Sequence, residues 1–333
     1  MTRLADLLAD LPGPDVASRD AVAARAATVL RPTGALARLD DVAAWLAAWQ
    51  RTERPEVERP HAIVFAADHG VAAAGVSAYP AEVTVAMLDA LEKGAATSAV
   101  MARALGVVLD VVDVGVARPT GDLRIEPSMD ADRFDDAVGA GVEAVERAAA
   151  ACADLLVFGE MGIGNTTAAA AVAATLYDEP AAVWCGRGTG LDDAGLARKI
   201  EAVESCRARV RARTGDPIEI LREAGGAELA AIAGATVAAR RHSIPVLLDG
   251  YVVTAAVAPL ASVRADALDH VIAGHRSAEP GHGRLLERLG LAPLLTLELR
   301  LGEGTGALAA VTLVRLAAVG VVDVATFQEW GLA

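Results

Sequence analysis

Short apolar runs alternate with longer amphipathic segments along most of this chain. The apolar runs predict buried strands at residues 62–67, 107–115, 155–158, 181–184, 245–248 and 267–273. In most of the segments between and after them the sequence predicts helices, at residues 81–91, 95–105, 134–153, 168–176, 192–213, 216–241 and 283–289. Because strands that alternate with helices suit right-handed βαβ crossovers, the pattern predicts an α/β fold with a parallel sheet flanked by helices.

The two ends of the chain lack this alternation. Residues 2–50 have apolar positions at helical spacing, with a break at Arg31-Pro32-Thr33-Gly34. The apolar run from Ala307 to Val324 contains two charged residues and a glycine, so it predicts a buried helix rather than a membrane span. No linker divides the chain. We therefore expect a small helical domain from residues 1–60 with about 307–333, and a large α/β catalytic domain over residues 61–306.

Charge and cysteine content narrow the range of partners and compartments. The 30 basic and 44 acidic residues give a net charge of −14, and the acids are spread along the chain. Nucleic acid and anionic membranes are therefore not expected partners, because both require a basic patch. The three cysteines have no CxxC spacing and the N-terminus has no signal pattern, which favours a cytoplasmic protein with reduced thiols.

The stretch from Leu155 to Thr167 has the most specific local pattern. It consists of a short apolar run, glycines at 159, 162 and 164, and two threonines before an alanine-rich helix. A strand, a glycine turn and a helix start present backbone N–H groups and a positive dipole end to an anion. The stretch therefore predicts an anion site with Glu160 at its mouth. A turn that only packs the helix on the strand is the alternative.

Three further side chains are candidates for chemistry. Glu303 lies between two glycines, where an acid finds little packing, and this favours a carboxylate that meets a ligand over a surface acid. Lys199, in the predicted helix 192–213, either reaches an anion or is solvated. Tyr79, in the loop at residues 75–80, either stacks on a flat ring or covers the loop.

Metal and dinucleotide signatures are missing from the sequence. It has no HExxH, no zinc-spaced Cys/His cluster, no Walker loop and no GxSxG elbow. His275 and His282 are separated by a proline and a glycine, so one continuous helix is not expected to carry both. We expect neither a metal nor a cofactor.

Six blocks, in order, carry motifs of one family between residues 31 and 331. They are Arg31 to Leu39, Ala67 to Pro80, Gly159 to Thr167, Gly186 to Lys199, Gly274 to His282 and Leu301 to Gly306. Together they resemble the nicotinate-nucleotide:5,6-dimethylbenzimidazole phosphoribosyltransferases, which make the lower-ligand nucleotide of cobalamin. Ala35 and Ala37 depart from the family's commoner residues. Ala81 stands where many members have a longer polar residue, so the choice of base stays open.

The resemblance implies a Rossmann-like parallel sheet, a small helical domain and a homodimer with the site near the subunit interface. It implies that nicotinate mononucleotide and 5,6-dimethylbenzimidazole give α-ribazole 5′-phosphate and nicotinate. Glu303 is implied as the general base, and Glu160 as the acid that meets the ribose or the charge at C1′. The residues implied for phosphate and ribose are Gly162, Gly164, Asn165, Thr166, Gly188, Lys199 and Ser277. Those implied for the base are Ser77, Tyr79 and Leu301.

Alternatives to this function remain. The same scaffold serves a catalytically silent nucleotide-binding relative, or an enzyme that uses a purine, another benzimidazole or a phenol as acceptor. A transferase acting from phosphoribosyl pyrophosphate needs adjacent acids after a strand and magnesium. Asp192-Asp193 opens a predicted helix and fits that role poorly.

Overall fold

A five-stranded parallel sheet forms the centre of the molecule, as the alternation of apolar runs predicts. The computed structural model describes residues 3–332, and residues 1–2 and 333 of the expected terminal helical segments lie outside this range. The strands are β1 (Pro60–Ala67), β2 (Val108–Gly115), β3 (Leu155–Met161), β4 (Val246–Leu248) and β5 (Val271–Ala273). Their order is β2-β1-β3-β4-β5, and every neighbouring pair is parallel. The predicted α/β class is confirmed.

Helices connect and cover these strands. The α-helices are α1 (Arg3–Leu8), α2 (Val16–Ala26), α3 (Arg38–Gln50), α4 (Val83–Glu92), α5 (Thr97–Leu105), α6 (Ala131–Ala150), α7 (Asn165–Leu176), α8 (Asp193–Arg211), α9 (Pro217–Ala224), α10 (Ala227–Arg241), α11 (Tyr251–Val263), α12 (Pro280–Leu289) and α13 (Thr305–Val322). Two short 3₁₀ segments, η1 (Gly70–Ala74) and η2 (Ala181–Val183), occur in the connections.

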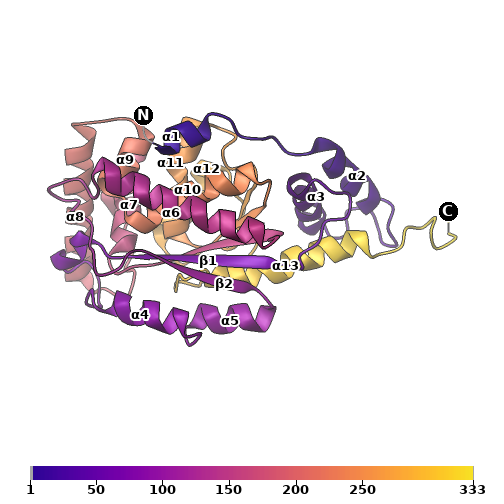
Figure 1. The fold of residues 1–333 in the computed structure, drawn as a ribbon, viewed down its shortest axis with the longest axis horizontal. Helices are drawn as coiled ribbons and strands as arrows, with labels where there is room; N and C mark the ends of the chain where they lie inside the picture. Colours follow the sequence, from indigo (N-terminus) through magenta and orange to yellow (C-terminus); the bar gives the residue numbers. More distant parts are fainter. Residues whose placement is uncertain (1–2, 333) are drawn as a thin grey trace.

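Alternate residues of the strands pack against different layers of helices. Ile63 and Phe65 of β1 join the core formed with α6, α7 and α10, whereas Ala62 joins the core formed with α3, α5 and α13. Figure 1 shows α6, α7 and α10 on one side of β1 and β2, and α4 and α5 on the other. Because both faces of β1, β3, β4 and β5 are covered, these strands consist of nearly continuous apolar residues. The edge strand β2 is partly exposed and carries Asp110 and Asp113.

Small residues let the helices approach each other closely. A Cβ at Gly141 of α6 would lie 1.9 Å from the carbonyl oxygen of Ala231 on α10. A Cβ at Gly234 of α10 would lie 2.4 Å from the carbonyl oxygen of Val138. Aromatics make up only 3% of the chain, so this core gains contacts from close backbone approach more than from large side chains.

The two ends of the chain meet beside the sheet. Figure 1 shows α2 and α3 next to the end of α13 and the C-terminus, and these three helices pack on one another. The first helix, α1, lies instead on α6 and α10. By length and composition α13 is able to cross a membrane, but it packs on α3, α5 and the sheet, and more than half of it is buried, as a core helix requires.

Three differences from the predicted elements concern local structure. Residues 181–184 are not a strand: Val183 and Trp184 donate their N–H groups to Pro180 and Ala181, which forms the 3₁₀ turn η2. A short apolar run does not by its pattern distinguish a strand from a buried turn. The last strand is shorter than predicted, and the predictions omitted α11, an Ala/Val-rich helix that contains Pro259.

Candidate functional site

The order in which the chain adds strands to the sheet reverses between β1 and β3. From β1 the chain crosses to β2 on one side, while β3, β4 and β5 follow on the other. Ligands of open α/β sheets bind beyond the carboxyl ends of the strands at such a point. A cavity of about 690 Å³ is lined there by the end of β3, by residues that follow β3 and β4, by α4, and by four loops at residues 76–79, 188–189, 275–279 and 300–303.

The cavity brings together nearly all of the residues predicted for the site. Those that line it are Ser77, Tyr79, Glu160, Gly162, Gly164, Asn165, Thr166, Gly188, Ser277, Leu301 and Glu303. Lys199 is the one predicted site residue that does not line the cavity directly. It lies behind Thr166, as described next.

The start of α7 forms one end of the cavity. Gly164, at φ +98°, is the residue before the helix, and no side chain caps the helix there. Lys199 of α8 is buried, and its Nζ donates to Thr166 Oγ1 at 2.8 Å and to the Gly186 carbonyl oxygen at 3.2 Å. Burial lowers the pKa of Lys199, and the nearby Glu279 acts in the opposite direction. A helix start backed by a buried cation suits a phosphate.

Removing this cation tests the phosphate site. We expect Lys199→Met, which keeps most of the side-chain volume, to raise the KM for a nucleotide roughly 5- to 150-fold, or about 1–3 kcal/mol for one lost charge-assisted contact. Steady-state kinetics measure the change. The matched control is Lys93→Met, because Lys93 is an exposed lysine on the end of α4 that pairs with Asp89. Equal KM values for the two variants would show that Lys199 does not contribute to binding of the phosphate.

A buried histidine and a buried glutamate support the glycine turn from beneath. His69 Nε2 lies 2.6 Å from Glu228 Oε1, and both side chains are completely buried. A Cβ at Gly162 would lie 3.4 Å from the His69 ring, and a Cβ at Gly164 would lie 3.3 Å from its Cβ atom. The turn therefore rests directly on the His69 side chain, and this explains why the Asp68-His69-Gly70 block stands at the end of β1.

Glu160 belongs to β3 rather than to the turn after it, because the strand continues to Met161. Its Oε2 accepts a short hydrogen bond from Asn165 Nδ2, which joins it to the first residue of α7. Burial, followed by the charges of Asp249 and Glu228, raises the pKa of Glu160 well above its usual value. A carboxyl group held in this way gains most from a ligand that brings positive charge.

Glu303 is not in a loose turn, contrary to the picture of an unpacked acid between glycines. Its side chain is 3% exposed, and its N–H donates to the Glu160 carbonyl oxygen at 3.1 Å. Its φ of +58° lies between +85° at Gly302 and +83° at Gly304, a left-handed run that is costly for a residue with a side chain. Strain of this kind persists only where the surroundings fix it.

Two neighbours fix the Glu303 segment. The Asp249 carboxylate accepts the N–H groups of Gly304, Gly306 and Ala307 at 3.2, 2.8 and 3.0 Å, and so caps α13. On the other side, Gly159 of β3 lies so close that a Cβ there would be 2.4 Å from the Gly304 nitrogen. Sequence reasoning left Asp249 out of the site, although its position directly after β4 pointed to the carboxyl edge of the sheet.

Adding one methyl group at this contact is expected to displace Glu303. Gly159→Ala should destabilise the fold by about 1–3 kcal/mol, as overpacking does, and should lower kcat because the shifted atoms belong to the Glu303 segment. Chemical denaturation and steady-state kinetics measure the two effects. Gly215→Ala is the control, since a Cβ there meets nothing within 4 Å. If Gly159→Ala keeps its full kcat, the close packing is not what positions Glu303.

Apolar side chains complete the part of the cavity near Tyr79. Tyr79 and Leu301 are each 55% exposed, and Ser77 Oγ lies 3.1 Å from Thr189 Oγ1. Val83, Met87 and Met161 are among the apolar lining residues that the sequence reasoning missed. Their helical or strand spacing gave no sign of a ligand. Flexible thioethers beside an aromatic ring provide a surface on which a flat apolar ring packs well.

Ser277 is held by a buried histidine. His282 Nδ1 lies 2.9 Å from both the Ser277 nitrogen and Oγ, and His282 Nε2 lies 3.0 Å from Thr254 Oγ1. Burial, followed by the nearby His275 and Arg276, lowers the pKa of His282 to about 3, so the ring is neutral. His69 therefore supports the glycine turn, and His282 orients Ser277, at the cavity wall. Within residues 3–332, no group of three His, Cys, Asp or Glu side chains is placed to hold a metal ion.

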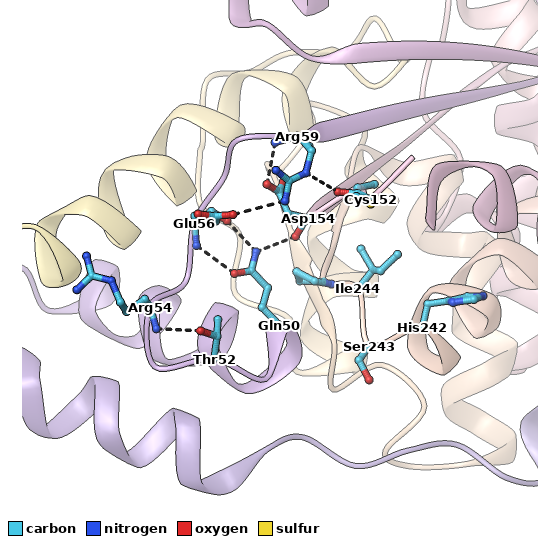
Figure 2. Close-up of a pocket in the computed structure, with 12 residues that line it drawn as sticks. Gln50, Thr52, Arg54, Glu56, Arg59, Cys152, Asp154, His242, Ser243 and Ile244 are labelled. Carbon is cyan, nitrogen blue, oxygen red and sulfur yellow. Dashed lines mark hydrogen bonds and ion pairs between the residues drawn. The ribbon is translucent and has the colours of Figure 1, made fainter. Parts of the chain in front are cut away.

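A second hollow of about 500 Å³ lies at the opposite, amino end of the strands (Figure 2). Its polar groups mostly pair with one another. Gln50 Nε2 donates to the carbonyl oxygens of Glu56 and Asp154 at 2.7 and 2.9 Å, and Arg59 Nε donates to the Cys152 carbonyl oxygen at 2.8 Å. These bonds attach the segment after α3 to the end of α6. The hollow lies away from the glycine turns and the acids, so we place the functional site in the larger cavity.

Comparison with known proteins agrees with this placement. The family described as phosphoribosyltransferase matches residues 11–332. A nicotinate-nucleotide–dimethylbenzimidazole phosphoribosyltransferase of Mesorhizobium japonicum is 51% identical over 97% of this chain and 95% of its own length. One from Ruegeria pomeroyi is 49% identical over 100% and 97%. The crystal structure of CobT from Thermus thermophilus, 42% identical, covers 95% of this chain and 99% of its own with a TM-score of 0.91.

Proposed function

Because the chain belongs to the nicotinate-nucleotide–dimethylbenzimidazole phosphoribosyltransferase family, we propose that it transfers phosphoribose from nicotinate mononucleotide to 5,6-dimethylbenzimidazole. The products are nicotinate and α-ribazole 5′-phosphate, the lower-ligand nucleotide of cobalamin. One observation carries the assignment to this cavity. The start of α7, which we assign to the phosphate, is connected through Asn165 to Glu160 and through the Glu160 backbone to Glu303.

This order of groups matches the order of groups in the substrate. The 5′-phosphate binds at Gly162, Gly164, Thr166 and Gly188, with Lys199 behind Thr166 and with Ser277 on the cavity wall. Asn165 and Glu160 then meet the ribose and C1′. The base packs against Tyr79, Leu301 and the apolar side chains near them, with Ser77 at the edge, and its ring nitrogen faces Glu303.

The chemistry is a single displacement at C1′. Glu303 accepts the proton of the benzimidazole N–H, and the lone pair of the other ring nitrogen forms the new bond to C1′. The bond from C1′ to the pyridinium nitrogen breaks, and its electron pair neutralises the leaving nicotinate. The Glu160 carboxylate stabilises the positive charge that develops at C1′. Attack on the face opposite the nicotinate converts the β-nucleotide into the α-product.

Three further properties are part of the proposal. The helical domain consists of residues 1–60 with 307–333, and the large domain of residues 61–306; the mutual packing of α2, α3 and α13 supports this division, with α1 as the exception. The protein is a homodimer, which the exposed Val85 and Val108 on the α4 and β2 side support. It acts in the cytoplasm, in keeping with its free cysteines.

Release of nicotinate tests the reaction directly. Purified protein is incubated with nicotinate mononucleotide, with and without 5,6-dimethylbenzimidazole, and nicotinate is followed by chromatography. We expect release that depends on the base. A panel of a purine, unsubstituted benzimidazole and a phenol then ranks the acceptors. Release without any base would indicate a hydrolase, and nucleotide binding without release would indicate a silent relative.

A further inference from the structure

Helix α5 begins without a cap from its own sequence. Its N-cap residue is Ala96, which has no side-chain acceptor for the free N–H groups of the first turn. Those groups must find another partner, because Ala96 and Ser98 are buried. The partner comes from the far end of the chain.

That partner is the carboxylate of Glu303. Its Oε2 accepts Ser98 Oγ–H at 3.0 Å and the Ser98 N–H at 3.4 Å, and both side chains are almost completely buried. The positive end of α5 and two donors therefore act on a single oxygen. The other acidic and basic residues of the cavity lining are three acids, one histidine and one arginine: Glu160 on β3, Asp249 after β4, Glu279, His275 and Arg300. His275 Nε2 lies 3.4 Å from Asp249 Oδ1, and Arg300 donates to the Gly188 carbonyl oxygen at 3.2 Å.

From this geometry we propose that Ser98 is a positioning residue for Glu303: it holds Oε2 and leaves Oε1 to take the proton. The inference rests on the proposed role of Glu303 as base. Without Ser98 the carboxylate faces two acids with one donor fewer. The hydroxyl therefore determines which oxygen of the carboxylate is free to react.

The test is the pH profile of kcat for Ser98→Ala. Loss of a hydrogen bond to the charged form makes that form less favourable, so the acid limb of the profile should move to higher pH. We expect kcat at pH 7 to fall about tenfold with an unchanged KM for nicotinate mononucleotide. Ser98→Cys, whose thiol is a weaker donor, should move the limb by a smaller amount in the same direction. The Cys variant also serves if the Ala variant does not fold.

Thr97→Ala is the matched control, because it removes an exposed hydroxyl from the same first turn of α5. Its pH profile should equal that of the unmodified protein. A merely structural role for Ser98 would lower the melting temperature and leave the acid limb in place, and that result overturns the proposal. Glu303→Gln is measured in parallel. If it keeps its rate, the proposed function of Glu303 fails; if only Glu303→Gln loses activity and Ser98→Ala keeps the normal profile, the present inference alone fails.

Discussion

Glu303→Gln is expected to lower kcat at least 100-fold while the protein still binds nicotinate mononucleotide. The amide keeps the size of the side chain and is able to accept the hydrogen bonds of Ser98, but it does not take a proton from the attacking base. A positioned general base typically contributes about 10²–10⁴-fold to a rate. Single-turnover kinetics and nucleotide binding by calorimetry separate the two properties.

The control for this variant is Glu298→Gln, the same change at an exposed acid on the segment that leads to the site. It should leave kcat unchanged. A Glu303→Gln protein that turns over at the unmodified rate would show that the benzimidazole loses its proton elsewhere. Loss of nucleotide binding in that variant would instead assign Glu303 to the nucleotide.

Glu160→Gln is expected to lower kcat strongly and at the same time to stabilise the empty protein. Burial and two neighbouring acids raise the pKa of Glu160 in the folded state above its unfolded value. The stability that this group contributes is therefore complete below the unfolded pKa of about 4.5 and is lost as the pH rises through the folded pKa. A neutral amide at this position does not ionise, so the variant does not lose this stability as the pH rises.

The measurement is the melting temperature between pH 4 and pH 8, together with kcat. The Gln variant should have the flatter profile, should melt at the higher temperature at pH 8, and should lose roughly 10²–10³-fold in kcat as charge stabilisation at C1′ is removed. Glu92→Gln, at an exposed position on α4, is the control for both. If the Glu160→Gln protein is less stable than the unmodified protein at pH 8, ionisation of buried Glu160 does not destabilise the fold, and the prediction is wrong.

Much of the fold follows from the apolar pattern because parallel strands are buried on both faces. Their runs of Val, Leu, Ile and Ala are long and differ from the helical spacing around them. The strand predicted at residues 181–184 was wrong because four apolar residues in a buried turn have the same pattern as a short strand. Helix α11 was not predicted because its residues 251–260 are all buried. It therefore has no polar face that would give the sequence a helical period.

Motifs that are local in the sequence indicate the part of the candidate site around the start of α7. Glu160, Asn165 and Thr166 lie within seven residues of each other, and glycines mark their turn. Ser98 has no such mark: it lies 205 residues from Glu303, and only the packing of α5 beside α13 brings the two together. The pairing of His69 with Glu228 was hidden for the same reason, since 159 residues separate them.

The anomeric configuration of the product tests the single displacement most directly. The protein is incubated with nicotinate mononucleotide and 5,6-dimethylbenzimidazole, and the ribosyl product is compared by NMR with α and β standards. Direct attack by a base activated by Glu303, with Glu160 only stabilising charge, predicts the α-nucleotide alone. A β-nucleotide would show two successive displacements, with Glu160 or another group bonded to C1′ in between, and would contradict the mechanism proposed for this cavity.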